Sequence, residues 1–87
     1  MTIGFPNASR SYDGGRRVVR FWGHDKAMET SFFITSHALQ RIEPGAVADE
    51  EGLLAVFDRN RSRICDVAAK LYERDRKGSY ELDFEDF

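Results

Sequence analysis

The stretch Arg17–Thr35, RVVRFWGHDKAMETSFFIT, decides the fold of this chain. It consists of two runs rich in β-branched and aromatic residues, separated by the turn-forming letters GHDK. The runs predict two antiparallel strands, Arg17–Trp22 and Ala27–Thr35. Because successive strand residues point to opposite faces, Phe21 and Trp22 belong to different sides of the sheet. One face should therefore lie on a core while the other stays partly in contact with water.

The residues before and after this hairpin extend the predicted sheet. Asp13-Gly14-Gly15 follows Tyr12, and such residues supply the positive φ that tight hairpins need. A three-stranded meander is therefore expected over residues 9–35. Residues 79–84, SYELDF, alternate apolar and acidic residues and predict a fourth strand that could pair at either edge of the meander.

Two helices are predicted between the meander and the last strand. Ser36 is expected to cap a short helix over residues 36–43, which the following Pro-Gly ends. Asp49 is expected to cap a long helix over residues 49–75, which carries an apolar stripe at helical spacing. The sequence thus predicts one α+β domain over residues 1–87, with an antiparallel sheet packed by one long and one short helix.

Polar residues interrupt the apolar stripe of the long helix in the segment FDRNRSRI, Phe57–Ile64. Asn60 and Arg61 fall there beside Phe57, and a buried charge needs a partner. In the first interpretation they are structural, with Arg61 paired to a carboxylate or a strand carbonyl and Asn60 bonded to a loop backbone. In the second they form the floor of a binding groove beside the sheet. In the third they lie at a dimer interface, where arginine and aromatic residues are enriched.

The charges are unevenly distributed along the chain. Residues 1–42 contain six Lys/Arg and three Asp/Glu, whereas residues 43–87 contain seven Lys/Arg and twelve Asp/Glu. The net charge of −2 argues against a general polyanion binder. A basic first half and an acidic second half suggest either a solvated surface or self-complementary packing, within one chain or between two copies.

Cysteine usage and hydropathy indicate a cytoplasmic protein. The single cysteine, Cys65, permits no disulfide within the chain, which fits a reducing compartment. The start, MTIGFPNASRS, lacks the basic and apolar regions of a signal peptide, and no segment approaches the ~18 apolar residues of a membrane helix.

The residues that carry most enzyme chemistry form no recognisable pattern. His24, His37 and Cys65 are not spaced as metal ligands, and no phosphate-binding glycine loop or nucleophile elbow is present. Cys65 has no basic residue one helical turn ahead and should remain a protonated thiol. We therefore expect no cofactor, no metal and no enzymatic activity.

Arginines and aromatic residues alternate on the first hairpin. Arg16, Arg17 and Arg20 lie close to Phe21 and Trp22 in the sequence. Arginines can position phosphates while exposed aromatic rings stack on unpaired bases. Binding to nucleic acid through these arginines is therefore the alternative hypothesis, although the acidic total weakens it.

Several short motifs together resemble a known bacterial family. FPN, SYD, RRVVRFWG, FFIT and FDRNRSRI occur in that order between Phe5 and Tyr72. This pattern resembles the family called domain of unknown function 1488, which implies a small stand-alone α+β domain with no known activity. Arg61 matches the family pattern, as do its apolar flanks. Asn60 departs from it, because the family often has histidine there, and acid–base chemistry at this position is not expected.

These observations lead to a functional prediction. We expect a non-enzymatic interaction or regulatory domain that binds a protein partner or forms a homodimer. The candidate structural or interaction residues are Phe57, Asn60, Arg61 and Trp22. The alternative is a nucleic-acid-associated protein, and a small enzyme comes third.

Overall fold

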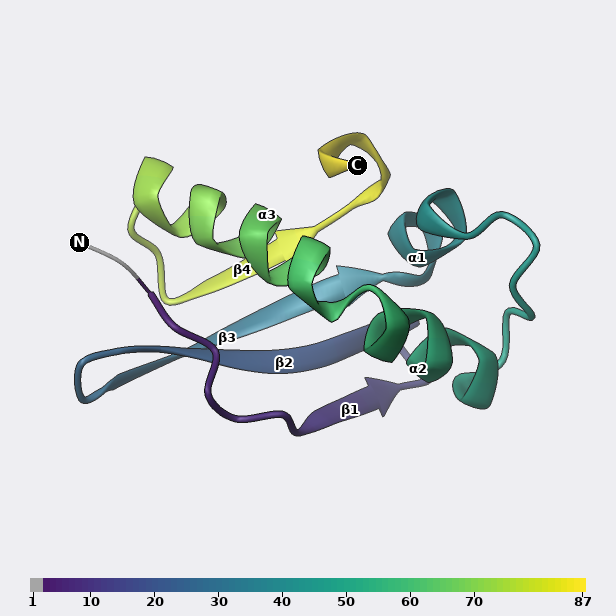
Figure 1. The fold of residues 1–87 in the computed structure, drawn as a ribbon, viewed down its shortest axis with the longest axis horizontal. Helices are drawn as coiled ribbons and strands as arrows, with labels where there is room; N and C mark the ends of the chain where they lie inside the picture. Colours follow the sequence, from purple (N-terminus) through teal and green to yellow (C-terminus); the bar gives the residue numbers. More distant parts are fainter. Residues whose placement is uncertain (1–2) are drawn as a thin grey trace.

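A four-stranded sheet forms the centre of residues 3–87, the part of the chain that the computed structural model describes (Figure 1). Strands β1 (Arg10–Asp13), β2 (Val18–Asp25) and β3 (Met28–Thr35) form an antiparallel meander. Strand β4 (Ser79–Leu82) pairs in parallel with β3, so the strand order is β1-β2-β3-β4. The predicted α+β class and the meander are confirmed, and the last strand takes the β3 edge.

The short helix α1 (Ser36–Ile42) follows directly from β3. Its N-cap is Thr35 rather than the predicted Ser36, because the Thr35 hydroxyl accepts the first-turn backbone hydrogen bond. The predicted strand over residues 79–84 ends at Leu82, and a short 3-10 helix, η1 (Phe84–Asp86), follows.

The predicted continuous helix over residues 49–75 is wrong. The structure has two helices, α2 (Glu50–Arg59) and α3 (Arg61–Arg74), separated at Asn60. The backbone of Asn60 leaves the helical region, with φ −115° and ψ 19°. The predicted cap at Asp49 is confirmed, since its side chain accepts a hydrogen bond from the backbone of the first turn at 2.7 Å.

Two hairpin turns place non-glycine residues in the left-handed region. Arg17 has φ 57° and Lys26 has φ 58°, whereas no glycine within residues 3–87 has a positive φ. The expectation that Gly14 and Gly15 supply the positive φ of the first turn is therefore wrong. The second turn is also shorter than predicted, because β2 continues to Asp25 and only Lys26-Ala27 connects the strands.

Aromatic rings form the centre of the core on one face of the sheet, which α2 and α3 cross (Figure 1). The ring of Phe21 stacks on Phe32 with centroids 5.4 Å apart, and Phe32 stacks on Tyr80 at 5.2 Å. Phe57 of α2 contacts Phe21 at 5.1 Å. The helices are thus held to the sheet by burial of large apolar side chains.

The segment before β1 also lies on this core face. A Cβ atom at Gly23 would come within 2.8 Å of the side chains of both Ile3 and Phe5 and 3.0 Å from Phe32. Gly23 is therefore required by the close approach of the N-terminal segment. This approach leaves the opposite face of the sheet as the candidate surface for function.

Candidate functional site

The face of the sheet away from α2 and α3 carries polar, charged and aromatic side chains at alternate strand positions. We call it the open face. Its members, which are exposed or half-buried, are Ser11, Arg20, Trp22, His24, Glu29, Ser31, Phe33, Ser79 and Glu81. At the end near α1 the open face stops, since Val18 is buried there.

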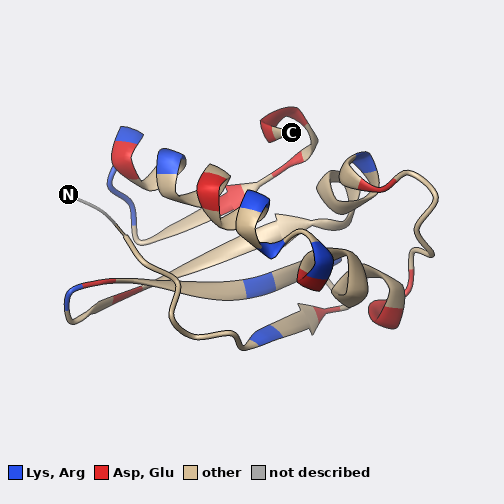
Figure 2. Ribbon diagram, in the orientation of Figure 1, with Lys and Arg blue, Asp and Glu red and all other residues tan. Residues whose placement is uncertain are grey.

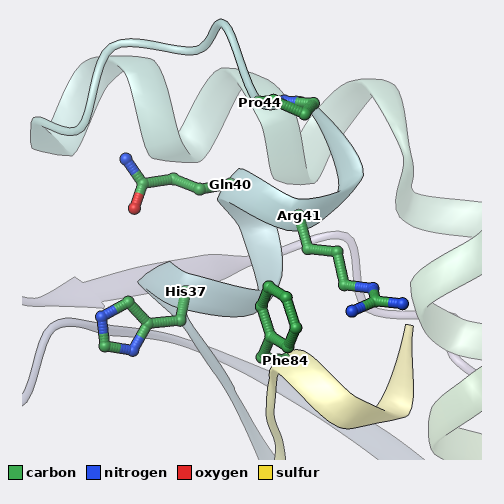
Figure 3. Close-up of a pocket in the computed structure, with 5 residues that line it drawn as sticks. All are labelled: His37, Gln40, Arg41, Pro44 and Phe84. Atoms are coloured by element: carbon green, nitrogen blue, oxygen red, sulfur yellow. The ribbon is translucent and has the colours of Figure 1, made fainter.

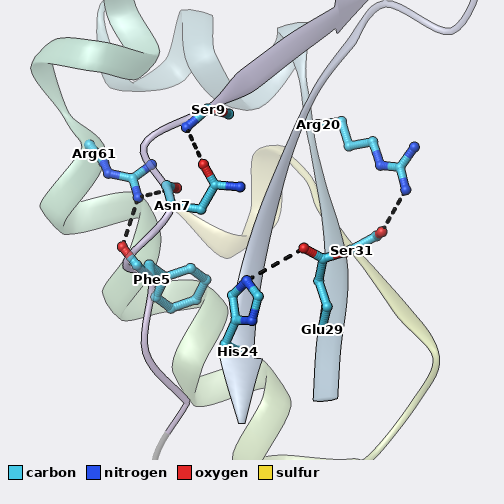
Figure 4. Close-up of polar contacts among 8 residues, drawn as sticks. All are labelled: Phe5, Asn7, Ser9, Arg20, His24, Glu29, Ser31 and Arg61. Carbon is cyan, nitrogen blue, oxygen red and sulfur yellow. Dashed lines mark hydrogen bonds and ion pairs between the residues drawn. The ribbon is translucent and has the colours of Figure 1, made fainter. Parts of the chain in front are cut away.

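Arg20 lies at the centre of the open face and contacts its neighbours in two ways. Its guanidinium carbon lies 5.1 Å from the ring centre of Trp22 and 5.7 Å from that of Phe33. Its Nη2 donates a hydrogen bond to the Ser31 hydroxyl at 2.9 Å (Figure 4). Each cation–π contact at an exposed site stabilises the fold by about 0.5–1 kcal/mol. Arg20 is therefore held in place with its charge directed along the open face.

Arg16 comes from the first turn and lies over the same aromatic ring. Its guanidinium carbon is 4.7 Å from the centre of Phe33. Two shallow hollows share Arg16 and Phe33: one of about 510 Å³ extends toward residues 78–81, and one of about 470 Å³ extends toward residues 11–14. The ring of Phe33 thus stands as a ridge between two depressions.

One row of residues crosses all four strands at this ridge. The strand register places Ser11 beside Arg20, Arg20 beside Phe33, and Phe33 beside Glu81. Neighbouring strands lie about 4.8 Å apart. A positive and a negative side chain therefore flank the phenyl ring at similar distances on opposite sides.

The two faces of the molecule treat their charges differently. On the helix side, acidic and basic residues are interspersed along α2 and α3 (Figure 2). Ion pairs form between Arg10 and Asp58 at 2.8 Å and between Arg59 and Glu43 at 2.6 Å. The hydrogen bond between Arg10 and Asp58 is the main reason why the pKa of Arg10 is raised and the pKa of Asp58 is lowered. On the open face, His24 Nε2 lies 3.4 Å from Glu29 Oε2 (Figure 4), whereas no ion pair involves the central Arg20 within residues 3–87.

The third arginine of the hairpin lies apart from the other two. Arg17 occupies the left-handed position of the turn, and its carbonyl accepts a hydrogen bond from the Ser36 backbone N–H at 2.9 Å. Among the described residues, cation–π contacts with Phe33 involve Arg16 and Arg20 and do not involve Arg17. The structure therefore brings together two of the three arginines predicted to act as a group.

Asn60 joins α2 to α3 and contacts the loop before α2. Its Nδ2 donates to the Val56 carbonyl at 2.9 Å and to Glu43 Oε2 at 2.6 Å. Arg59 donates to the same carboxylate through Nε and Nη2. The hydrogen bonds from Arg59 and then Asn60 lower the pKa of Glu43. The Asn60 amide thus has partners within its own chain, but they are a carboxylate and a helix carbonyl rather than the loop backbone that the structural interpretation expected.

Arg61 finds its partners in its own chain. Its Nη2 donates to the carbonyls of Phe5 and Asn7, each at 3.0 Å (Figure 4). The arginine therefore holds the N-terminal segment over the core, and the partners are loop carbonyls rather than a carboxylate or a strand. Its Nη1 is buried and has no hydrogen-bond partner within the described residues.

Phe57 and Trp22, also singled out in the sequence, lie in different environments. Phe57 is fully buried among the core rings. Trp22 is half-buried on the open face under Arg20. Only Trp22 of this pair is available to an external partner.

Cys65, the cysteine considered as a nucleophile, lies on α3 outside the open face. Burial raises the pKa of the Cys65 thiol, which the positive charge of Arg61 opposes. Among residues 3–87, no group of three His, Cys, Asp or Glu side chains is placed to hold a metal ion. Across the same part of the chain, every helix is too short or too polar to cross a membrane.

Phe33 and Glu81, which lie beside Arg20 in the row across the open face, are not among the candidate residues of the sequence analysis. Strand alternation places Phe33 on the face of Glu29 and Ser31, but Phe32 beside it made the choice of the buried ring ambiguous. The position of Glu81 depends on parallel pairing with β3, which residue patterns do not encode. The sequence signal that could have identified Phe33 was strand alternation, which places it on the face opposite to that of Phe32.

The chain belongs to the family described as protein of unknown function DUF1488, whose model matches residues 3–82. It is also similar to a crystal structure of a DUF1488 family protein of unknown function from Shewanella loihica PV-4. The two share 22% sequence identity and a TM-score of 0.81, over 92% of this chain and 90% of that one. A search of curated proteins gave no match. The resemblance noted in the sequence is thus confirmed, and the bacterial structure shares the fold.

Proposed function

We propose that this DUF1488 protein is a non-enzymatic interaction or regulatory domain that forms a homodimer through the open face. The observation that carries the proposal is the row of residues in which Arg20 and Glu81 flank Phe33. A dimer with twofold symmetry uses the same patch on both copies, so the patch must be complementary to itself.

The row meets this requirement if the twofold axis runs along β3 between the facing sheets. Rotation about that axis exchanges the two sides of the row. Phe33 of one copy then faces Phe33 of the other, while Arg20 faces Glu81 in both directions. Sheets that pack face to face keep their strands aligned within about 30°, which this axis permits.

The chemistry of the open face also suits a protein partner. Trp and Arg are enriched among residues that dominate interface energies, and here Trp22 and Arg20 lie beside each other. Arg20 has no ion pair within its own chain among the described residues, so pairing with a second copy would break none. The two hollows beside Phe33 offer space for side chains of the other copy.

The area of the open face sets the expected strength of the dimer. Two strands of eight residues and two of four, at about 3.3 Å per residue and 4.8 Å between strands, give a patch of roughly 380 Å² per copy. Stable interfaces bury about 800 Å² per partner. We therefore expect a dimer with a Kd in the micromolar range or weaker, which forms and dissociates with concentration.

A non-enzymatic role is supported by the protonation state of Cys65, the single cysteine of the chain. Burial favours the protonated thiol at Cys65, and thiols in that state are poor nucleophiles. We also place the domain in the cytoplasm, as its single cysteine suggests.

Light scattering over a dilution series tests this proposal. From about 1 µM to about 1 mM, the mass should rise from the 10.0 kDa of one chain toward twice that value. Phe33→Ala should keep the protein monomeric at the highest concentration. A wild type that remains monomeric throughout would refute the homodimer.

Single-stranded nucleic acid is the second candidate for the same face. Its support is the presence of Trp22 and Phe33 on adjacent strands, next to Arg16 and Arg20. Four-stranded sheets with exposed aromatic residues can stack bases in this way. Acidic residues oppose the binding of phosphates there: Glu29 and Glu81 lie on the open face, and Asp13 lines the hollow beside Arg16 and Arg20.

Labelled single-stranded DNA and RNA at low salt test the second candidate. Binding should weaken with added salt and with Arg20→Ala, and Arg16→Ala and Arg17→Ala would rank the contributions of the other two arginines. No binding at low salt would exclude it, because electrostatic attraction is strongest there.

A further inference from the structure

An apolar groove of about 520 Å³ lies between α1 and η1, and it shares no residue with the open face (Figure 3). One side of the groove is formed by three side chains of α1 and by the proline that follows the helix. The other side is formed by Phe84 of η1. The lining residues are His37, Gln40, Arg41, Pro44 and Phe84. Its volume is within the range of small-molecule sites, about 300–1,000 Å³.

The helical spacing of α1 builds one wall of the groove. His37, Gln40 and Arg41 stand three and four residues apart, so their side chains emerge on the same side of the helix. Pro44 follows the end of the helix and closes the upper part of the wall (Figure 3).

A set of hydrogen bonds fixes the other wall. The Thr35 hydroxyl donates to Asp83 Oδ1 at 2.9 Å, and the same carboxylate oxygen accepts from the Phe84 backbone N–H at 2.7 Å. The Asp86 side chain in turn accepts from the Asp83 backbone N–H at 2.7 Å. Phe84 is thus positioned against α1 before any ligand arrives.

Phe84 is unusual in being exposed. Its exposed fraction is 51%, and it is the aromatic side chain among the large exposed apolar residues of the described chain. Arg41 lies over the ring, with its guanidinium carbon 4.3 Å from the ring centre. Figure 3 shows the ring between His37 and Arg41, next to the hollow.

The polar side chains of the groove can all donate hydrogen bonds. Arg41 carries a permanent positive charge, and Gln40 and His37 add N–H groups. No carboxylate lines the groove, and within residues 3–87 none lies at ion-pair distance from Arg41.

Three of the carboxylates near the groove have other partners, and the fourth, Glu85 of η1, is exposed and does not lie at ion-pair distance from Arg41. Asp83 and Asp86 accept the hydrogen bonds that fix η1. Glu43 accepts from Arg59 and Asn60. The cationic side of the groove is therefore left to pair with an external anion.

We propose that this groove binds a small organic monocarboxylate with an apolar body. The apolar body lies against Phe84 and Pro44, and the carboxylate pairs with the guanidinium of Arg41, whose two parallel N–H groups match a carboxylate. Gln40 and His37 supply further hydrogen bonds to the carboxylate oxygens. The site is independent of the proposed dimer.

Two matched ligand pairs test the site on the full chain. Phenylacetate and hexanoate are titrated into ¹⁵N-labelled protein and followed by NMR, next to the neutral amides phenylacetamide and hexanamide. The account predicts shifts at His37, Gln40, Arg41 and Phe84, and at least about tenfold weaker binding for each amide. Binding equal for acid and amide would overturn the proposal, as would shifts confined to other residues or no shift at about 10 mM.

Two variants assign the binding to the groove. Arg41→Gln should weaken carboxylate binding by at least about tenfold while leaving amide binding unchanged, and Phe84→Ala should weaken both ligands. Arg63→Gln is the matched control, because Arg63 lies over Phe87 at 5.7 Å in a similar exposed contact. Carboxylate binding that survives Arg41→Gln, or falls equally in Arg63→Gln, would overturn the role of Arg41.

Discussion

The two faces of the sheet use neighbouring residues for opposite purposes. On the core face, Phe21 and Phe32 are fully buried and stack on one another. One position further along each strand, Trp22 and Phe33 are half-buried and covered by arginines instead of helices. The pleat of the strands thus divides adjacent aromatic residues into a stabilising set and a surface set.

The comparison also extends to the charges. On the helix side, Arg10 and Arg59 pair with carboxylates of the same chain. On the open face, the guanidinium of Arg20 makes cation–π contacts with two aromatic rings and donates a hydrogen bond to a serine hydroxyl. The core face therefore explains why the chain folds, and the open face is where binding is expected.

The largest difference should appear when adjacent phenylalanines are removed. Phe32→Ala should lower the free energy of unfolding by about 3–5 kcal/mol, because it leaves a cavity among stacked rings. Phe33→Ala should cost about 1 kcal/mol, since it removes cation–π contacts and little buried area. Urea unfolding monitored by circular dichroism measures both. Equal losses would show that the open face also contributes to the core.

A smaller effect is expected at the arginine that ties the N-terminal segment to the core side. Arg61→Met should lower the free energy of unfolding by about 2 kcal/mol, because two carbonyls lose a charged donor. Arg63→Met, at an exposed position two residues away, is the control. Hydrogen exchange near residues 5–7 should become faster only in Arg61→Met. Unchanged stability with loss of an interaction partner would instead make Arg61 functional.

Acid should remove the stability that the Glu43 carboxylate contributes through its contacts with Arg59 and Asn60. Arg59 and Asn60 lower the pKa of Glu43 from its ordinary value of 4.5, so the folded state favours the charged carboxylate. The stability that this carboxylate contributes is full above pH 4.5 and is lost as the pH falls through the lower folded-state pKa.

The variant Glu43→Gln checks this sign. Thermal unfolding should show it less stable than wild type at pH 7, with the difference shrinking as the pH falls below 4.5. A difference that grows on acidification would contradict the assignment. Glu85→Gln, an exposed carboxylate of η1, serves as the control.

The smallest predicted effect concerns the turn that joins β2 to β3. This turn sets the register of the two strands, which carry residues of both faces. Lys26 adopts φ 58°, which costs a side-chain-bearing residue about 1–2 kcal/mol. Lys26→Gly should relieve this cost at an entropic loss of about 0.5–1 kcal/mol, for a net gain of about 0.5 kcal/mol. The melting temperature should rise slightly, whereas a fall would show that the Lys26 side chain stabilises the turn.

Local patterns predicted the elements better than their junctions. Alternation in Arg17–Thr35 placed Phe21 and Trp22 on opposite faces correctly, because that assignment depends only on strand period. Periodicity could not reveal the break at Asn60, since the apolar stripe continues from α2 into α3 and the side chain of Asn60 contacts Glu43, 17 residues away.

The candidate site was harder to predict than the fold. Arg16, Arg20 and Trp22 could be singled out from their residue types, but Phe33 and Glu81 join them only through strand register. Arg17 was grouped with its neighbours because sequence adjacency does not show which turn residue adopts the left-handed conformation.

Exchange of the two charges that flank Phe33 tests the central claim most directly. Arg20 and Glu81 lie two strands apart on either side of Phe33, and within residues 3–87 they form no ion pair with each other. Light scattering should therefore show that Arg20→Glu abolishes the dimer and that adding Glu81→Arg restores it, while Lys70→Glu on α3 has no effect. A dimer that survives Arg20→Glu, or that the second change fails to restore, would contradict self-association through the open face.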